Sequence, residues 1–84
     1  MGEYADIKKN KMKRFLKWLS NNRDIDIAKG GNHNQNIKYA YGERPYPVPV
    51  KHNVIDKNIV KALKKQLVKE WKVCTEEEFD KRLK

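Results

Sequence analysis

The sequence contains a single cysteine, three prolines, four glycines and two histidines among its 84 residues. One cysteine excludes an intrachain disulfide, and Cys74 has no partner for a CxxC zinc motif. No apolar run approaches the ~20 residues that a membrane-spanning helix needs, and the N-terminus lacks the apolar stretch of a signal peptide. We therefore expect a cytoplasmic protein with no membrane partner, no metal and no other cofactor, in which Cys74 is a small hydrophobic residue beside a helix start.

Positive charge, in contrast, is abundant. Basic residues outnumber acidic ones by 20 to 11, which gives a net charge of +9. Residues 1–23 and residues 51–73 each carry seven basic and two acidic side chains, whereas residues 24–50 are neutral and residues 74–84 carry a net charge of −1. Two basic flanks favour a polyanionic partner, which is nucleic acid, an anionic membrane or an acidic protein. Solubility alone is the alternative explanation.

The chain is long enough for one small domain, 1–84, and not for two. Apolar residues at i, i+3, i+4 and i+7 predict an amphipathic helix from about Asp6 to Asn21. Its expected buried residues are Met12, Phe15, Leu16 and Leu19. Because Met12 is also a candidate start of the essential domain, residues 1–11 are an optional N-terminal extension.

Three strands are expected in the centre of the chain. Alternation of polar and apolar residues predicts strands over 24–28 and 36–41, and Gly42-Glu43-Arg44 is typical of a hairpin turn. Prolines at every second position of 45–50 leave all the missing N–H donors on one side, which predicts an edge strand. A polyproline II segment is the alternative for this stretch.

The C-terminal third is expected to form two helices. Asn53 or Asp56 can cap a helix that ends near Trp71, and the sequence from Thr75 to Glu78 is a capping box for a short last helix. The apolar stripe of the longer helix comprises Ile55, Ile59, Val60, Leu63 and Leu67, and that of the last helix comprises Phe79 and Leu83. The resulting prediction is an α+β fold, in which a three-stranded antiparallel sheet is covered by helices on one face.

The residues best suited to chemistry surround the glycine pair. His33 can titrate near neutral pH, and Gly30 and Gly31 permit close approach of a phosphate to the backbone. Cleavage of RNA needs a base for the 2′-OH, an acid for the leaving 5′-oxygen, and donors or cations that stabilise the phosphorane. His52 is a candidate second acid, base or phosphate ligand, or a loop residue before a helix cap. The nearby cations are Lys29, Lys38, Arg44 and Lys51.

The aromatic residues have a simpler interpretation. Trp18 and Trp71 are expected at the edge of the core, and base stacking is the less favoured alternative. The tyrosines of the strands, Tyr39, Tyr41 and Tyr46, are expected to be sheet residues, one of which would face RNA if its face is uncovered.

Taken in order, these motifs resemble the HicA-type toxins, the mRNA interferases of bacterial toxin–antitoxin pairs, over about residues 12–83. The resemblance rests on Lys29-Gly30-Gly31-Asn32-His33, on the strand that ends in Lys51-His52, on 59–63 and on 75–79. It differs at position 32, where this chain has Asn and serine is usual, and at the polar start of the second strand, 34–36.

The resemblance implies a double-stranded-RNA-binding-like α-β-β-β-α fold with a short C-terminal helix. It implies a metal-independent endoribonuclease in which His33 is catalytic, with mRNA as substrate and a HicB-like antitoxin as inhibitor, in a homo-oligomer or a toxin–antitoxin hetero-oligomer. The RNA-binding residues that follow are Lys29, Gly30, Gly31, Asn32, Lys38, Lys51 and His52. The alternatives are a non-catalytic RNA-binding module of the same fold and a basic adaptor for an acidic protein.

Overall fold

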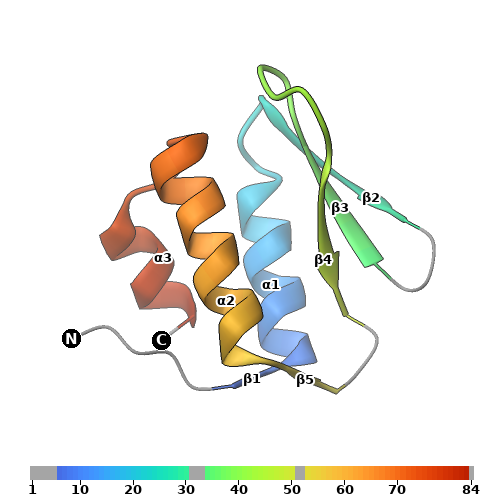
Figure 1. Cartoon of the computed structure of the whole chain (residues 1–84), viewed down its shortest axis with the longest axis vertical. Helices are drawn as coiled ribbons and strands as arrows, with labels where there is room; N and C mark the ends of the chain where they lie inside the picture. Colours follow the sequence, from blue (N-terminus) through green and yellow to red (C-terminus); the bar gives the residue numbers. More distant parts are fainter. Residues whose placement is uncertain (1–5, 31–33, 51–52, 84) are drawn as a thin grey trace.

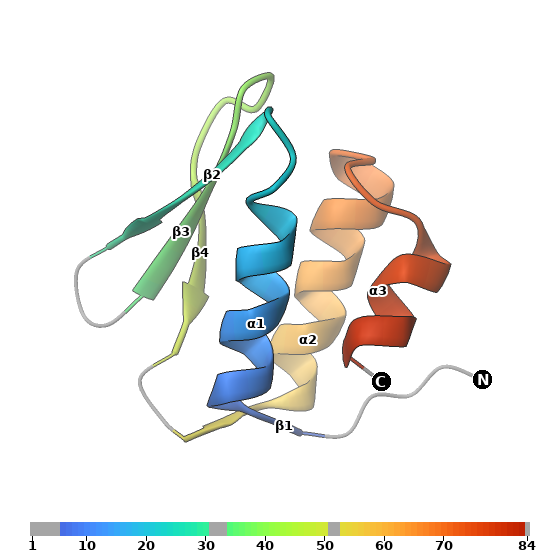
Figure 2. The same ribbon diagram turned by 180° about the vertical axis from the view of Figure 1, so that it is seen from behind.

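The computed structural model describes residues 6–30, 34–50 and 53–83, and it has an α+β fold (Figure 1). A three-stranded antiparallel sheet lies on one side of a pair of helices, α1 and α2, and a short C-terminal helix, α3, lies on the other side (Figures 1 and 2). The predicted class and the predicted antiparallel sheet are thus confirmed. The elements are β1 (Ile7–Lys8), α1 (Lys9–Leu19), β2 (Ile25–Lys29), β3 (Asn34–Tyr39), β4 (Tyr46–Pro49), β5 (Val54–Ile55), α2 (Lys57–Lys64), the π-helix η2 (Lys65–Glu70) and α3 (Glu76–Leu83).

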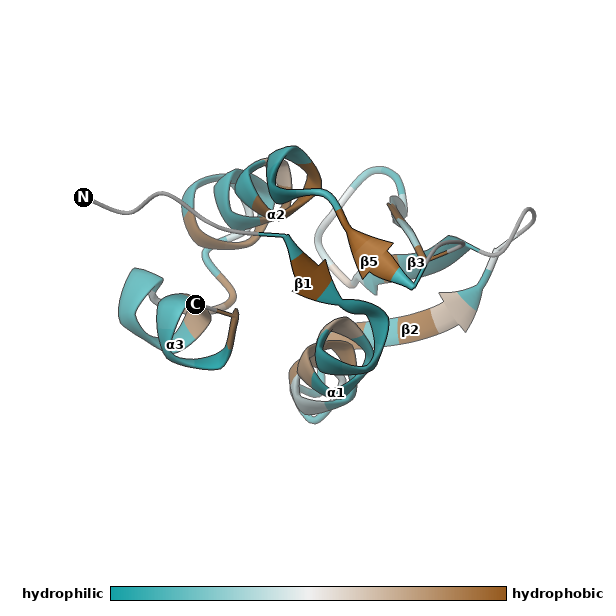
Figure 3. Cartoon of the chain, turned by 90° about the horizontal axis from the view of Figure 1, so that it is seen from below, coloured by the Kyte–Doolittle hydropathy of each residue, from teal (hydrophilic) through white to brown (hydrophobic). Residues whose placement is uncertain are grey.

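The first helix buries the four residues that its spacing predicts, Met12, Phe15, Leu16 and Leu19. It begins at Lys9, however, and not near Asp6 as predicted. The Asp6 carboxylate accepts a hydrogen bond from the Lys57 backbone N–H at 2.9 Å, and β1 pairs with β5 across the end of the helical layer (Figure 3). Ile7, at 6% exposure, is therefore part of the core.

The strand order β2-β3-β4 is the predicted meander, with β4 at an edge. Ile37 of β3 is opposite Ile27 on one side and Tyr46 on the other, and its side chain is fully buried against the helices. The strand expected over 36–41 is β3, and it begins at Asn34, two residues earlier, because its first residues pair with the end of β4. Tyr41 lies beyond β3 and is 76% exposed.

The long helix is capped by Asp56, whose carboxylate accepts the Asn58 N–H at 3.0 Å. Ile55 was expected in the apolar stripe of this helix, but it belongs to β5, where it is buried opposite Ile7. The last turns form a π-helix that the sequence does not reveal, in which Trp71 N–H donates to the Gln66 carbonyl at 2.9 Å. Leu67, which was expected in the apolar stripe of the long helix, is buried within this π-helix.

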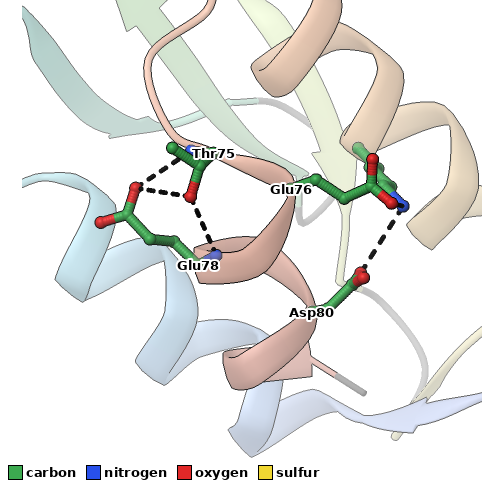
Figure 4. Close-up of polar contacts among 5 residues, drawn as sticks. Thr75, Glu76, Glu78 and Asp80 are labelled. Carbon is green, nitrogen blue, oxygen red and sulfur yellow. Dashed lines mark hydrogen bonds and ion pairs between the residues drawn. The ribbon is translucent and has the colours of Figure 1, made fainter.

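The capping box at the start of α3 is confirmed (Figure 4). The Glu78 N–H donates to the Thr75 hydroxyl at 3.1 Å, and the Thr75 N–H donates to the Glu78 carboxylate at 3.0 Å. Lys64 of α2 lies 3.2 Å from the Glu76 carboxylate and 3.6 Å from that of Asp80, which ties α3 to α2. No helix in the described part of the chain is long and apolar enough to cross a membrane.

Candidate nucleic-acid interface

The predicted site residues fall partly outside the described chain. Gly31, Asn32, His33, Lys51 and His52 lie outside the described residues. Lys29, Gly30 and Lys38 lie within them. The structure nevertheless describes the residues on either side of 31–33 and 51–52, and these flanks indicate where the two motifs enter and leave the sheet.

The flanks of both motifs meet at one end of the sheet (Figure 2). The Gly30 N–H donates to the Asn34 carbonyl at 2.8 Å, which closes the β2–β3 hairpin. Asn34 is in turn the register partner of Pro49 at the end of β4. The structure therefore brings the stretch before residue 31, the stretch after residue 33 and the stretch before residue 51 to the same place.

These flanks line a pocket of about 240 Å³ together with lysines of α1 and β2. Its polar residues suit an anion because none of them is acidic. The side chains and backbone that line it include Lys9, Lys13, Lys29, Gly30, Asn34 and Val50.

Gly30 lies against the side chain of Asn36. A Cβ at this position would lie 2.7 Å from Nδ2 of Asn36 and 3.0 Å from its Cγ, well inside contact distance. The glycine thus lets the Asn36 side chain lie against the backbone of the hairpin end. The group that lies close to Gly30 in this structure is thus a side chain of the protein, and the predicted approach of a phosphate to this backbone stays a prediction.

A second pocket of about 320 Å³ continues along α1 and shares Lys13 and Gln35 with the first. It adds Lys17 and Ser20 from the helix and Ile27 from β2. We call the two pockets together the basic groove, which is bordered by Lys9, Lys13, Lys17 and Lys29.

The lysines of α1 in the groove follow helical geometry. Lys9, Lys13 and Lys17 are spaced four residues apart and so share one face of the helix. The lysine face borders the apolar stripe of α1 on the side next to the sheet. Leu16 of that stripe lines the same pocket as Lys13 and Lys17. This spacing is visible in the sequence, but the side on which the sheet packs is not, and the sequence prediction therefore missed these residues.

The charge at the start of α1 works against the stability of the helix, whereas Lys17 in its last turn is favourably placed. Its first turn contains no acidic residue and no side chain caps it, while lysines occupy the end at which the helix dipole is positive. Within the described chain, no ion pair involves Lys9, Lys13 or Lys17. An anion bound near the start of α1 would offset this unfavourable arrangement.

Lys38 is not brought to the groove. Strand alternation places Lys29 on the inner face of the sheet with Ile27, whereas Lys38 lies on the outer face, opposite Asp26 in the register. If Lys38 contacts RNA, it does so from the other side of the sheet.

Two of the pockets outside the groove compete with it as ligand sites. One, of about 420 Å³, lies at the β3–β4 turn beside η2, where Tyr46 and Trp71 meet with ring centroids 6.4 Å apart. Glu43 and Glu70 line it and make it less suited to phosphate. The sequence expectation that Trp71 lies at the core edge is confirmed.

The other pocket, of about 350 Å³, lies between α1 and α3 on the opposite flank of α1. It is cationic, since Lys11, Arg14 and Lys81 line it with Arg82. The Arg82 guanidinium lies 4.1 Å from the ring centroid of Trp18, so this tryptophan stacks on a cation of its own chain. Neither flanking stretch of the histidine motifs reaches this pocket.

Two described residues with raised pKa values, Cys74 and Tyr46, lie outside the groove. Burial raises the pKa of the Cys74 thiol to about 11, helped by the nearby Glu78 carboxylate, and burial also raises the pKa of Tyr46. Cys74 is a buried structural residue, as predicted. Among the described residues there is no cluster of three or more histidine, cysteine or acidic side chains that would hold a metal ion.

Comparison with protein-family models, with curated proteins and with solved structures gives no match for this chain. The resemblance to HicA-type toxins therefore remains a prediction from the sequence motifs, and the functional argument depends on the groove.

Proposed function

We propose that this protein is an RNA-binding endoribonuclease of the toxin type, which holds the RNA backbone in the basic groove and uses His33 for proton transfer. One observation carries the proposal. Gly30 and Asn34, the described residues nearest to His33 on either side, line the same pocket as Lys9, Lys13 and Lys29. The candidate catalytic residue thus belongs to a stretch that begins and ends at a cationic pocket.

The groove suits a nucleic-acid strand better than a small anion. Lys9 and Lys17 are eight residues apart on one helix face, which corresponds to about 12 Å along the axis at 1.5 Å per residue. A row of cations of this length can contact more than one phosphate of a strand. Gln35 and Asn34 add amide groups that can hydrogen-bond to sugar or phosphate oxygens.

The proposed reaction needs no group beyond the RNA and the protein. A base removes the proton of the 2′-OH, the 2′-oxygen forms a bond to phosphorus, and the bond from phosphorus to the 5′-oxygen breaks. The leaving 5′-oxygen takes a proton from an acid. His33 is proposed as one of these two groups. Lys29, with Lys51 of the neighbouring stretch, is proposed to hold the phosphate as negative charge develops on it.

The proposed partner besides RNA is an antitoxin of the HicB type that covers the site. This part of the proposal rests on the motif resemblance and on the net charge of +9, which favours an acidic inhibitor. An inhibitor of that kind would compete with RNA for the same lysines.

The test uses the full chain and a fluorescently labelled, mixed-sequence single-stranded RNA. We expect the wild-type protein to cleave it in the presence of a chelator, His33→Ala to bind it with unchanged affinity but not cleave it, and growth arrest on expression to be lost with cleavage. Thermal melting checks that the variant is folded. Cleavage by folded His33→Ala at the wild-type rate would overturn the role of His33, and binding without cleavage by both proteins would favour the RNA-binding module.

A further inference from the structure

The two edges of the sheet differ in their backbone hydrogen-bonding groups. In an antiparallel pair, hydrogen-bonded and non-hydrogen-bonded residue pairs alternate along the ladder. Gly30 N–H donates to Asn34 and Ala40 N–H donates to Asp24, both at 2.8 Å, so the even-numbered residues of β2 turn their backbone groups toward β3. Ile27 and Lys29 therefore turn their N–H and C=O groups to the outside.

The same alternation gives the opposite result at β4. The odd-numbered residues of β3 face β4, so Tyr46 and Val48, their register partners, turn their backbone groups inward. Pro47 and Pro49 lie at the positions that face the outside. Proline has no N–H, and this edge therefore lacks donors where another strand would need them. One edge of the sheet is blocked and the other is open.

The open edge of β2 borders the basic groove. Ile27 lines the groove with its side chain while its backbone groups form the edge. The Ile25 N–H is already used by the Asn22 carbonyl at 3.0 Å. No strand in the described part of the chain pairs with this edge. A strand added there would place every second side chain over the inner face, next to Lys13 and Lys17.

We propose that the open edge of β2 accepts a strand from an acidic protein partner, by β-strand addition, with alternate carboxylates facing Lys13, Lys17 and Lys29. Main-chain hydrogen bonds to Ile27 and Lys29 give the strand its register, and the lysines select its charge. A second copy of this chain is disfavoured, because its net charge of +9 and its own Lys29 would face the same lysines.

Such a strand would occupy the groove that we propose for RNA. Docking would therefore inhibit RNA binding, and this regulatory consequence rests on the proposed function. The docking of the strand does not rest on the proposed function, because it depends only on the open edge of β2 and on the lysines beside it. It is tested below by direct binding without RNA.

The probe is a capped peptide that alternates glutamate with threonine over the length of β2, and its matched control alternates lysine with threonine. We expect the glutamate peptide to bind the full chain at low salt, to weaken as salt rises, and to slow hydrogen exchange of the Ile27 and Lys29 amides in NMR spectra. The lysine peptide should neither bind the chain nor slow the exchange of these two amides. A glutamate peptide that fails to bind at millimolar concentration, or binds without affecting these two amides, would overturn the proposal.

Two variants at one position separate the backbone from the side chain. Ile27→Ala and Ile27→Pro both shorten the side chain, but only proline removes the outward N–H, and neither alters an N–H that bonds to β3. We expect Ile27→Pro to bind the glutamate peptide at least about tenfold more weakly than Ile27→Ala, with both folds confirmed by circular dichroism. Equal affinities would contradict strand addition. A dimer of the wild-type chain that Ile27→Pro abolishes would assign the edge to a second copy.

In a third measurement, the glutamate peptide should displace labelled RNA from the wild-type chain. If it binds at Ile27 and Lys29 but leaves RNA bound, the strand site stands and the proposed RNA path along the groove is wrong. If no RNA binds in any condition, the proposed function fails while the peptide experiment still decides the docking.

Discussion

The basic groove makes a quantitative prediction about RNA affinity. In the variant Lys13→Gln with Lys17→Gln, two exposed lysines of the groove lose their charge, while glutamine keeps the helix propensity close to that of lysine. The matched control is Lys61→Gln with Lys65→Gln, two exposed lysines of the α2–η2 helix outside the groove. Both double variants lower the net charge from +9 to +7, so they differ only in where the charge is lost.

The expected magnitude follows from counterion release. Each phosphate contact contributes a slope of about −0.7 to the dependence of log affinity on log salt for single strands, so two lost contacts reduce the slope by about 1.4. Extrapolated from a 1 M reference, this corresponds to a loss of about 25-fold in affinity at 0.1 M salt. The control should lose less than about threefold, because its lysines do not line the groove and salt screens charge interactions over a length of ~10 Å at that concentration.

The assay is a titration of labelled single-stranded RNA by fluorescence anisotropy at several salt concentrations. Unfolding in urea should show that both double variants keep their stability to within about 0.5 kcal/mol, as is usual for surface substitutions. Equal changes in slope for the two variants would mean that RNA senses only the overall charge. An unchanged slope in the groove variant would exclude the groove as the RNA path.

Three further predictions concern the described fold. Thr75→Ala removes the hydroxyl that accepts the Glu78 N–H, and should lower the free energy of unfolding in urea by about 1 kcal/mol, whereas Glu78→Gln, which keeps an acceptor, should cost less. Gly30→Ala should destabilise by no more than about 1 kcal/mol, because its Cβ would lie 2.7 Å from the end of the Asn36 side chain, which can turn away, and adding Asn36→Ala should recover most of any loss in a double-mutant cycle. The Cys74 thiol has a folded pKa of about 11, above its ordinary 9.0, so the stability it contributes is complete below pH 9 and disappears as the pH rises through 11. Unfolding curves under reducing conditions should therefore show a loss of about 2–3 kcal/mol over this range, and that loss should be absent in Cys74→Ala.

Each of these has an outcome that contradicts it. Equal losses for Thr75→Ala and Glu78→Gln would mean that the negative charge, and not the hydrogen bonds, stabilises the start of α3. Additive effects of Gly30→Ala and Asn36→Ala would show that the two positions do not collide. Parallel pH profiles for the wild-type chain and Cys74→Ala would place the thiol in contact with water.

Much of the fold was predictable because its determinants are local. The spacing from Met12 to Leu19 defines one buried helix face, and the reciprocal bonds of Thr75 and Glu78 need only four consecutive residues. The alternating prolines also predicted an edge strand, because proline removes an N–H whatever its neighbours are.

The wrong predictions, the start of the first helix and the place of Ile55, concern residues that contact distant parts of the chain. Asp6 and Ile7 have the pattern of a helix start, but contacts with Lys57 and Ile55, about fifty residues away, hold them in an extended conformation. No local preference records such a contact. For the same reason the sequence did not reveal that Ile55 lies in a strand.

For the candidate site, the sequence by itself determined the chemistry that is available: many lysines, two histidines and a glycine pair between two strands. Only the tertiary structure decided which of these residues are neighbours. The register of β2 with β3 separates Lys29 from Lys38, and the packing of α1 against the sheet adds Lys9, Lys13 and Lys17. A helical pattern shows which face is buried, but the element that packs beside that face is set by contacts between residues far apart in the chain.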